Sequence, residues 1–420
     1  MNNNISKCLP FALLLLTLPH AGSAWADEDD AFSLVTSASW QYQDNVLYLP
    51  DGQRPPAVFG LNAPRGDQSY VASVGLNFNK RIGRQQLSAS ASQIMTRYND
   101  LKTLDNDGHN VLASWKWELG NDLSGQLRYS NRRYMQGFND FRSLTPVKNL
   151  VDLENLRFDA TYKLDAFWAL IGGVSRDSLR NGVPSRLGSD YDIDRYELGA
   201  RYTTRGGTSF ELVGIDTQGD YPNRLPTSNV TNSYSQKNLE ARIRWQPVGH
   251  SRLSASIGQA NRKHDNLPER DYEDVYGRVG WEWTPSGKFG VSFLAERQIS
   301  ALDDIVSSYF RTTTYSIAPM WQATGKLRFD GRVQWLSRDA SGDSFFSTLS
   351  PAEQAFYRVF FGIDGTARQE DITTYSLGAT WAIQRNLTAN AELRHDSRDS
   401  NVQFYQYRVR SVSMSLQYLF

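Results

Sequence analysis

Residues 408–420 read Arg-Val-Arg-Ser-Val-Ser-Met-Ser-Leu-Gln-Tyr-Leu-Phe. One parity of this stretch is apolar and comprises Val412, Met414, Leu416, Tyr418 and Phe420. The other parity is mostly polar and comprises Ser411, Ser413, Ser415, Gln417 and Leu419. Because successive side chains of a β-strand point to opposite faces, the stretch predicts a strand with one apolar face and one face in water.

Alternation that ends on a terminal Phe resembles the closing strand of bacterial outer-membrane β-barrels, and Phe420 is the last residue. From residue 31 onward, alternating segments of about 10–15 residues recur and are joined by short and long connections in turn. We therefore predict an all-β fold for residues 27–420. The expected architecture is a transmembrane antiparallel barrel of about eighteen strands with short periplasmic turns, long extracellular loops and periplasmic termini.

The composition excludes a helical membrane protein and gives no sign of nucleic-acid binding. Mean hydropathy is −0.52, and after residue 26 no stretch approaches the roughly 20 apolar residues of a spanning helix. The 45 basic and 45 acidic residues balance and are scattered along the chain, so no basic surface is expected.

The first 26 residues predict a signal peptide. Lys7 precedes an apolar run over residues 9–18, and Ala24-Trp25-Ala26 is a small-x-small cleavage site. Cys8, the single cysteine, lies inside this segment, so an exported mature chain has no disulfide and must be held together otherwise. A closed hydrogen-bonded barrel meets that need. The expected location is the outer membrane of a Gram-negative bacterium, with membrane lipid and the barrel-assembly machinery as partners.

Tryptophan positions support this interpretation. Most lie within a few residues of a predicted short turn, namely Trp115, Trp117, Trp168, Trp245, Trp281, Trp283, Trp321 and Trp381, whereas Trp40 and Trp335 lie beside long loops. Indoles favour the membrane–water interface, so we expect a periplasmic aromatic girdle and a thinner outer one. The alternative, a soluble sandwich core, would not sort tryptophan by turn length.

Charged residues fall on the parity opposite to the apolar one. The predicted pore-lining set is Arg201, Arg242, Arg244, Arg252, Arg278, Glu282, Arg328, Arg332, Glu392 and Arg394. Charge facing lipid at mid-membrane costs about 2–4 kcal/mol, so these side chains are expected to face inward. A barrel of this width retains an aqueous channel. Two roles remain open: mutual pairing of Arg and Glu, or a ladder of arginines that guides an anionic solute or sugar acid.

One loop predicts a short helix. Ser350-Pro351-Ala352-Glu353 reads as a capping box with Pro at the first helical position, and Gly362 is a natural stop. The helix would lie in the extracellular loop of residues 339–369 and carry Phe356, Tyr357, Phe360 and Phe361. These aromatics either fold inward as a constriction along which sugar rings slide or pack on the crown of loops.

No catalytic or metal site is expected. His109, His250, His264 and His395 are scattered without metal-ligand spacing, and no motif points to a cofactor. The His264-Asp265 and His395-Asp396 dipeptides would lie near the outer rim, where outer-membrane proteases place Asp and His, but protease barrels are narrower. We predict that the protein is not an enzyme.

Residues 40–51, Trp-Gln-Tyr-Gln-Asp-Asn-Val-Leu-Tyr-Leu-Pro-Asp, resemble a stretch near the mature amino terminus of EpsL-like proteins. These are outer-membrane barrels encoded with exopolysaccharide biosynthesis genes and related to the β-barrel porin 2 group. The resemblance implies export of a polysaccharide chain with a periplasmic polysaccharide-export protein as partner, and it brings no catalytic residues. A solute-uptake porin is the alternative, whereas an adhesin would need larger external domains.

Overall fold

The computed structural model describes residues 31–139, 146–224, 232–265, 268–301, 309–341, 346, 349–362 and 364–420. The predicted signal peptide, residues 1–26, lies outside the described residues. No helix within these ranges has the length and apolar character to cross a membrane. The described chain is built almost entirely from eighteen β-strands.

The first nine strands are β1 (Phe32–Gln43), β2 (Asp67–Ile82), β3 (Gln85–Tyr98), β4 (Asn106–Leu119), β5 (Leu123–Met135), β6 (Leu150–Lys163), β7 (Trp168–Asn181), β8 (Tyr191–Thr203) and β9 (Ser209–Asp220). The second nine are β10 (Ser233–Val248), β11 (Ser251–His264), β12 (Tyr272–Ser286), β13 (Phe289–Ala301), β14 (Tyr309–Gln322), β15 (Leu327–Ser341), β16 (Gln369–Ala382), β17 (Leu387–Ser400) and β18 (Tyr407–Leu419). One α-helix, α2 (Pro351–Phe361), interrupts this series between β15 and β16.

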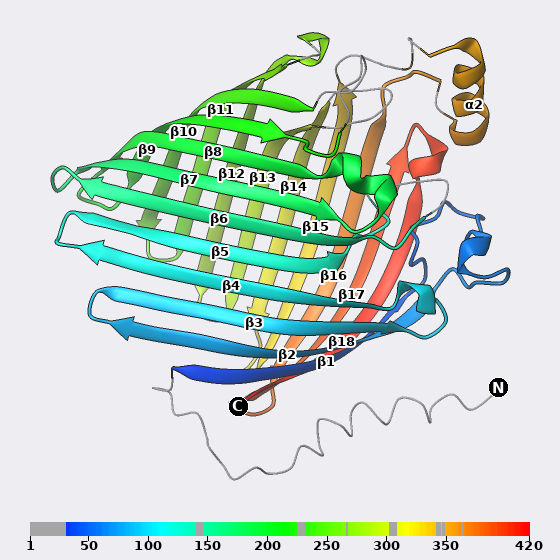
Figure 1. Ribbon diagram of the computed structural model, residues 1–420. Helices are drawn as coiled ribbons and strands as arrows, with labels where there is room; N and C mark the ends of the chain where they lie inside the picture. The colour runs from blue at the N-terminus through cyan, green and yellow to red at the C-terminus, as the bar shows by residue number, and fades with distance from the viewer. Residues whose placement is uncertain are drawn as a thin grey trace.

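Each strand pairs antiparallel with its neighbours in sequence, and β1 pairs with β18 to close the sheet (Figure 1). The β1–β18 pairing is the seam of the barrel. At the short-turn end of this seam, Leu34 and Phe420 exchange backbone hydrogen bonds of 3.4 and 2.8 Å. Closure satisfies the backbone groups that an open edge would expose to lipid. The predicted all-β, closed antiparallel barrel of eighteen strands is confirmed.

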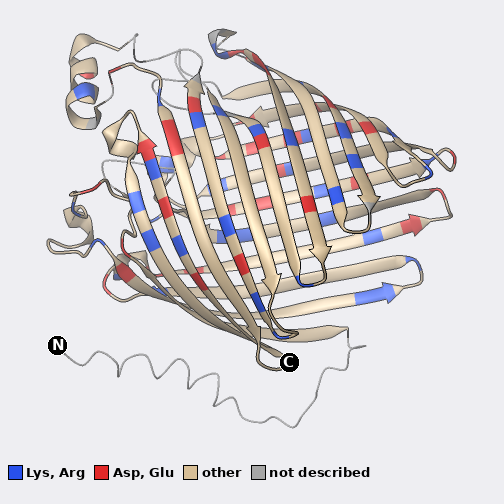
Figure 2. Cartoon of the chain, turned by 180° about the vertical axis from the view of Figure 1, so that it is seen from behind, with Lys and Arg blue, Asp and Glu red and all other residues tan. Residues whose placement is uncertain are grey.

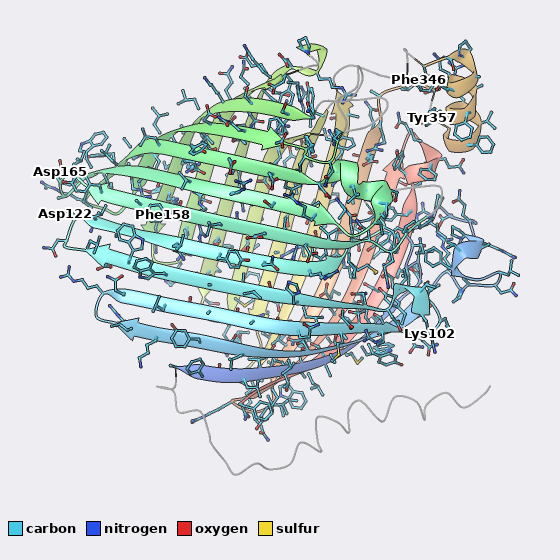
Figure 3. All side chains as sticks on the ribbon, in the orientation of Figure 1. Lys102, Asp122, Phe158, Asp165, Phe346 and Tyr357 are labelled. Carbon is cyan, nitrogen blue, oxygen red and sulfur yellow. The ribbon has the colours of Figure 1, made fainter. Side chains whose placement is uncertain are left out.

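The two ends of the barrel differ. Asp122 and Asp165 lie at the end of the short turns, whereas Lys102, Phe346 and Tyr357 lie at the opposite end with the long loops and α2 (Figure 3). The Asp165 carboxylate accepts hydrogen bonds from the backbone N–H groups of Phe167 and Trp168 at 2.7 and 2.8 Å. These bonds lower the pKa of the Asp165 carboxyl and stabilise the turn.

The apolar parity faces outward. Its side chains are exposed on the isolated barrel, as at Leu198, Leu377 and Ile257. The expected girdle residues Trp115, Trp168, Trp245, Trp281, Trp283, Trp321, Trp335 and Trp381 are exposed in the same way. An exposed apolar belt of this kind is stable only where lipid, rather than water, surrounds it.

Trp117 is the buried member of the girdle. Its indole lies over Gly125, where an added Cβ would meet the ring at 2.4 Å, and it stacks on Phe158 at 5.8 Å between ring centroids. The absence of a side chain at Gly125 therefore lets the indole lie flat across the sheet.

Asn45 stabilises the β1–β18 seam at the long-loop end of the barrel. Its side-chain amide donates to the carbonyls of Leu49 at 2.8 Å and Arg408 at 3.1 Å, and its oxygen accepts from the Leu49 N–H at 2.8 Å. These bonds fix the turn that follows β1. The apolar residues of this turn join a buried cluster at the long-loop end, made of Val46, Leu47, Leu49, Leu101, Leu104 and Phe138. The Asn-Val-Leu-Tyr-Leu stretch that carries the family resemblance is therefore a structural clasp.

A buried polar chain links the next loops along the rim. The Asn149 amide donates to the side-chain oxygen of Asn181 at 2.7 Å, and the Asn181 amide donates to Asp190 at 2.8 Å. Asn223 donates to the other Asp190 oxygen at 2.7 Å. Loops that follow β5, β7 and β9 are thereby joined into one crown.

Replacing Asn45 by Ala is expected to lower the free energy of unfolding by about 1–3 kcal/mol, because the buried N–H of Leu49 loses its acceptor and the Arg408 carbonyl loses a donor. Urea unfolding of the protein in lipid vesicles measures this. Gln53→Ala, at an exposed position of the same loop, should leave the midpoint unchanged. Equal midpoints for the Asn45 variant and the wild type would contradict the clasp.

Candidate functional site

The predicted pore-lining residues all lie on the inward parity. They are distributed over β8 (Arg201), β10 (Arg242, Arg244), β11 (Arg252), β12 (Arg278, Glu282), β15 (Arg328, Arg332) and β17 (Glu392, Arg394). Bands of both charge signs alternate along the strands (Figure 2). The predicted set thus lies on the face opposite to the apolar belt.

The tightest charge cluster lies on β8, β9 and β10. Glu211 pairs directly across the sheet with Arg201 and with Arg242, so one carboxylate lies between two guanidinium-bearing strands. Arg201 Nε lies 2.8 Å and Arg244 Nη1 3.3 Å from Glu211 Oε1, and Arg242 Nε lies 2.7 Å from Glu240. Arg242 also lies 3.8 Å from both Glu197 and Glu211, so three arginines share three carboxylates.

Further pairs lie around the rest of the wall. Their nearest N–O distances are 3.0 Å for Arg252–Glu282, 4.0 Å for Arg278–Glu296, 3.1 Å for Arg328–Asp330 and 2.7 Å for Arg394–Asp396. Arg332 and Glu392 have no ion-pair partner among the described residues. Most of the predicted pore-lining residues are thus in ion pairs, whereas Arg332 has no such partner among the described residues.

The paired side chains differ in how far they are exposed. Glu211 has only 2% of its side chain exposed, whereas Arg244, Arg252 and Arg278 are 61%, 65% and 58% exposed. Side chains on the inside of a closed wall reach such exposure only if the interior holds water. Arg244, Arg252 and Arg278 therefore present guanidinium groups to the lumen, and Glu282, with 59% of its side chain exposed, presents a carboxylate beside Arg252.

Several acids that form ion pairs on the inward face were not predicted from the sequence, among them Asp159, Glu211, Asp330 and Asp396. One signal was available. Arg and Asp or Glu two residues apart share a face of a strand, as in Arg157-x-Asp159, Arg328-x-Asp330 and Arg394-x-Asp396. Glu211 has no such neighbour in sequence and pairs only across the sheet.

A hollow at the short-turn end continues the basic lining. It is bordered by Arg81, Arg84 and Lys116, with Glu118 and Asp159 as the acidic members. Arg84 is held there by a 3.1 Å bond to Asn121, so the turn positions its charge.

The predicted loop helix is confirmed as α2. The Glu353 N–H donates to the Ser350 hydroxyl, the Ser350 N–H donates to Glu353 at 2.9 Å, and Gly362 ends the helix with a φ of 65°. The Ser350 hydroxyl and N–H bonds lower the pKa of the Glu353 carboxyl.

α2 stands at the outer rim, beyond the ends of the strands (Figure 1). Phe356 and Phe360 are exposed, and Tyr357 packs against a small cluster with Phe346 and Val402. A constriction formed by Phe356, Tyr357, Phe360 and Phe361 therefore stays a prediction; the Phe361 side chain lies outside the described positions.

The two His-Asp dipeptides are not assembled into reactive pairs. His264 Nδ1 lies 3.4 Å from Asp271, Asp265 accepts from Ser233, and His395 stacks on the outward-facing Tyr375. Within the described ranges, no group of three or more His, Cys, Asp or Glu could hold a metal ion.

These features define a transmembrane barrel of the Gram-negative outer membrane, because closure and an exposed apolar exterior satisfy the conditions for crossing a bilayer with strands. A family model described as "Putative beta-barrel porin 2" matches residues 357–419. No curated protein matches the chain.

Solved structures with similar folds include the outer membrane protein opdK of Pseudomonas aeruginosa, at 11% identity and a TM-score of 0.48, covering 93% of this chain and 99% of that one. A BenF-like porin of Pseudomonas fluorescens gives 11% and 0.47, covering 94% and 99%. OccAB3 of Acinetobacter baumannii gives 11% and 0.46, covering 93% and 99%.

Glu211→Gln is expected to lower the free energy of unfolding by about 1–2 kcal/mol, because a buried partner of three guanidiniums is lost while water screens the arginines. Glu282→Gln removes an exposed partner and should cost less than about 1 kcal/mol. Unfolding in lipid vesicles compares the two variants, and an equal cost would show that burial of Glu211 does not matter.

Proposed function

We propose that the protein is a water-filled channel of the outer membrane that admits small hydrophilic solutes and favours anions. The observation that carries this proposal is the exposure of Arg244, Arg252 and Arg278 inside a closed wall. Side chains cannot fill a barrel of eighteen strands, so a continuous aqueous path is expected.

The preference for anions follows from how the charges are layered. Glu211 and Glu240 have 2% and 11% of their side chains exposed, whereas Arg244, which pairs with Glu211, is 61% exposed. Arg332 adds a positive charge without an ion-pair partner among the described residues. A low-dielectric wall focuses the field of such charges on the lumen, which raises the local concentration of anions.

Planar bilayer recording with a salt gradient tests the proposal. The wild type should conduct and give a reversal potential on the anion-selective side. Arg244→Glu with Arg252→Glu should move the reversal potential toward cations, because two exposed lumen charges change sign. Arg408→Glu, an exposed residue near the outer loops that contacts Asp51, serves as the control. No conductance, or equal selectivity in both variants, would contradict the proposal.

Export of a secreted polysaccharide is the second candidate. The resemblance of residues 40–51 to EpsL-like proteins favours it, although Asn45 and Leu49 in this stretch serve the clasp. In this role a polysaccharide chain would pass the lumen, and a periplasmic polysaccharide-export protein would dock at the short-turn end.

Two measurements separate export from uptake. An exporter should be blocked by long oligosaccharides in bilayers, and a deletion strain should lose capsule or slime. An uptake channel should pass small sugar acids or amino acids freely, and its deletion should leave the exopolysaccharide unchanged. Free passage together with an unchanged exopolysaccharide would reject export.

A further inference from the structure

β2 reaches farther toward the short-turn end of the barrel than its neighbour β1. At the start of β1, the Asn79 N–H donates to the Ala31 carbonyl at 2.8 Å. β2 continues beyond this bond and stays paired with β3 up to Ile82. On the side of β1, no described residue stands opposite residues 80–82, and we call this short stretch the β2 edge. Its backbone groups can accept a further strand.

The β2 edge carries positive charge. Lys80 and Arg81 are both exposed, and neither forms an ion pair with a described residue. Arg81 also borders the basic hollow at the short-turn end, together with Arg84 and Lys116. Its Nε donates to the Gly83 carbonyl at 3.2 Å, which holds the guanidinium at the edge. The edge therefore suits a strand that carries carboxylates.

The chain has such a strand directly before β1. Residues 27–30, which lie outside the described residues, read Asp-Glu-Asp-Asp. Because β1 and β2 are antiparallel, each step back along β1 corresponds to a step forward along β2. Continuing the register sets Asp30 opposite Lys80 and Asp29 opposite Arg81. Two carboxylates and two cations thus match position by position.

We propose that residues 27–30 bind along the β2 edge as a continuation of β1. Backbone hydrogen bonds to β2 supply the affinity, and the two cross-strand pairs of opposite charge fix the register. By strand parity, Asp29 shares the inward face with Arg81, whereas Asp30 shares the outward face with Lys80. The bound segment lengthens the β1–β2 ladder and brings a counter-charge to the basic hollow at the short-turn mouth of the lumen.

Cross-linking of paired cysteines tests this register. Cys8, the single cysteine of the chain, lies before the predicted cleavage site, so the mature protein offers no competing thiol. Because the Asn79 N–H bonds to Ala31, the proposed register makes Glu28 and Ile82 a non-hydrogen-bonded pair with Cα atoms about 4.5 Å apart. That spacing suits a disulfide. Glu28→Cys with Ile82→Cys, in protein purified from the outer membrane, should therefore oxidise to an internal disulfide.

Glu28→Cys with Gln85→Cys is the matched control. Gln85 lies opposite Ile82 on β3, one strand farther from β1, so a segment that binds along the β2 edge does not reach it. Adding Arg81→Glu to the first cysteine pair sets two like charges opposite each other. This change should slow disulfide formation about threefold or more. Non-reducing gels separate internal disulfides from dimers, and heat-dependent migration shows that each variant is folded.

Equal cross-linking of the two cysteine pairs would overturn the proposal, and so would an unchanged rate in the Arg81→Glu variant. A disulfide between two chains would assign the β2 edge to a second copy of the protein. Folded protein without any disulfide would leave the edge to a strand of another protein. Either result also contradicts binding of residues 27–30. These measurements do not depend on conductance, so the channel function is tested separately.

Discussion

The backbone hydrogen-bond seam between β1 and β18 is the contact on which the rest of the structure depends. Lipid offers no partner to a free N–H or C=O, so a sheet in the membrane must close on itself. The Leu34–Phe420 bonds hold one end of the seam, and the Asn45–Arg408 bond holds the other. Once the seam is closed, the strands have one face in lipid and one in water, and every later property follows from that division.

Closure also explains the two kinds of loop. Turns at the Asp122 and Asp165 end connect neighbouring strands directly and need only local hydrogen bonds. The other end must hold longer segments, and it does so with the apolar cluster around Leu101 and Leu104 and the buried Asn149–Asn181–Asp190 chain. These contacts join the described parts of the outer loops to one another.

Strand parity was predictable because it depends on a period of two that each segment carries by itself. The alternation did not reveal the parity of β7, because Ala169 and Ile171 on the inward side are as apolar as Leu170 on the outward side. Only the pairing of β7 with β6 shows which side chains face outward. The loop helix was predictable for the same local reason, since its capping box lies within four residues. The partners of Glu211 and Asp190 were not, because they come from other strands and loops whose register a single segment does not encode.

The same residue types do different work on the two faces because their surroundings differ. Inside, Arg201 lies 2.8 Å from Glu211, and Glu211 is almost completely covered by its arginine neighbours. Outside, Arg133 and Arg176 lie 3.9 Å from Asp152 and Asp194, and all four side chains are substantially exposed. Net charge is therefore a poor guide to this protein: its formal charge is zero, yet the sheet sorts most of its apolar side chains to one face and the predicted pore-lining charges to the other. That separation follows from strand parity and closure alone, so it would survive any exchange of loops that leaves the seam intact.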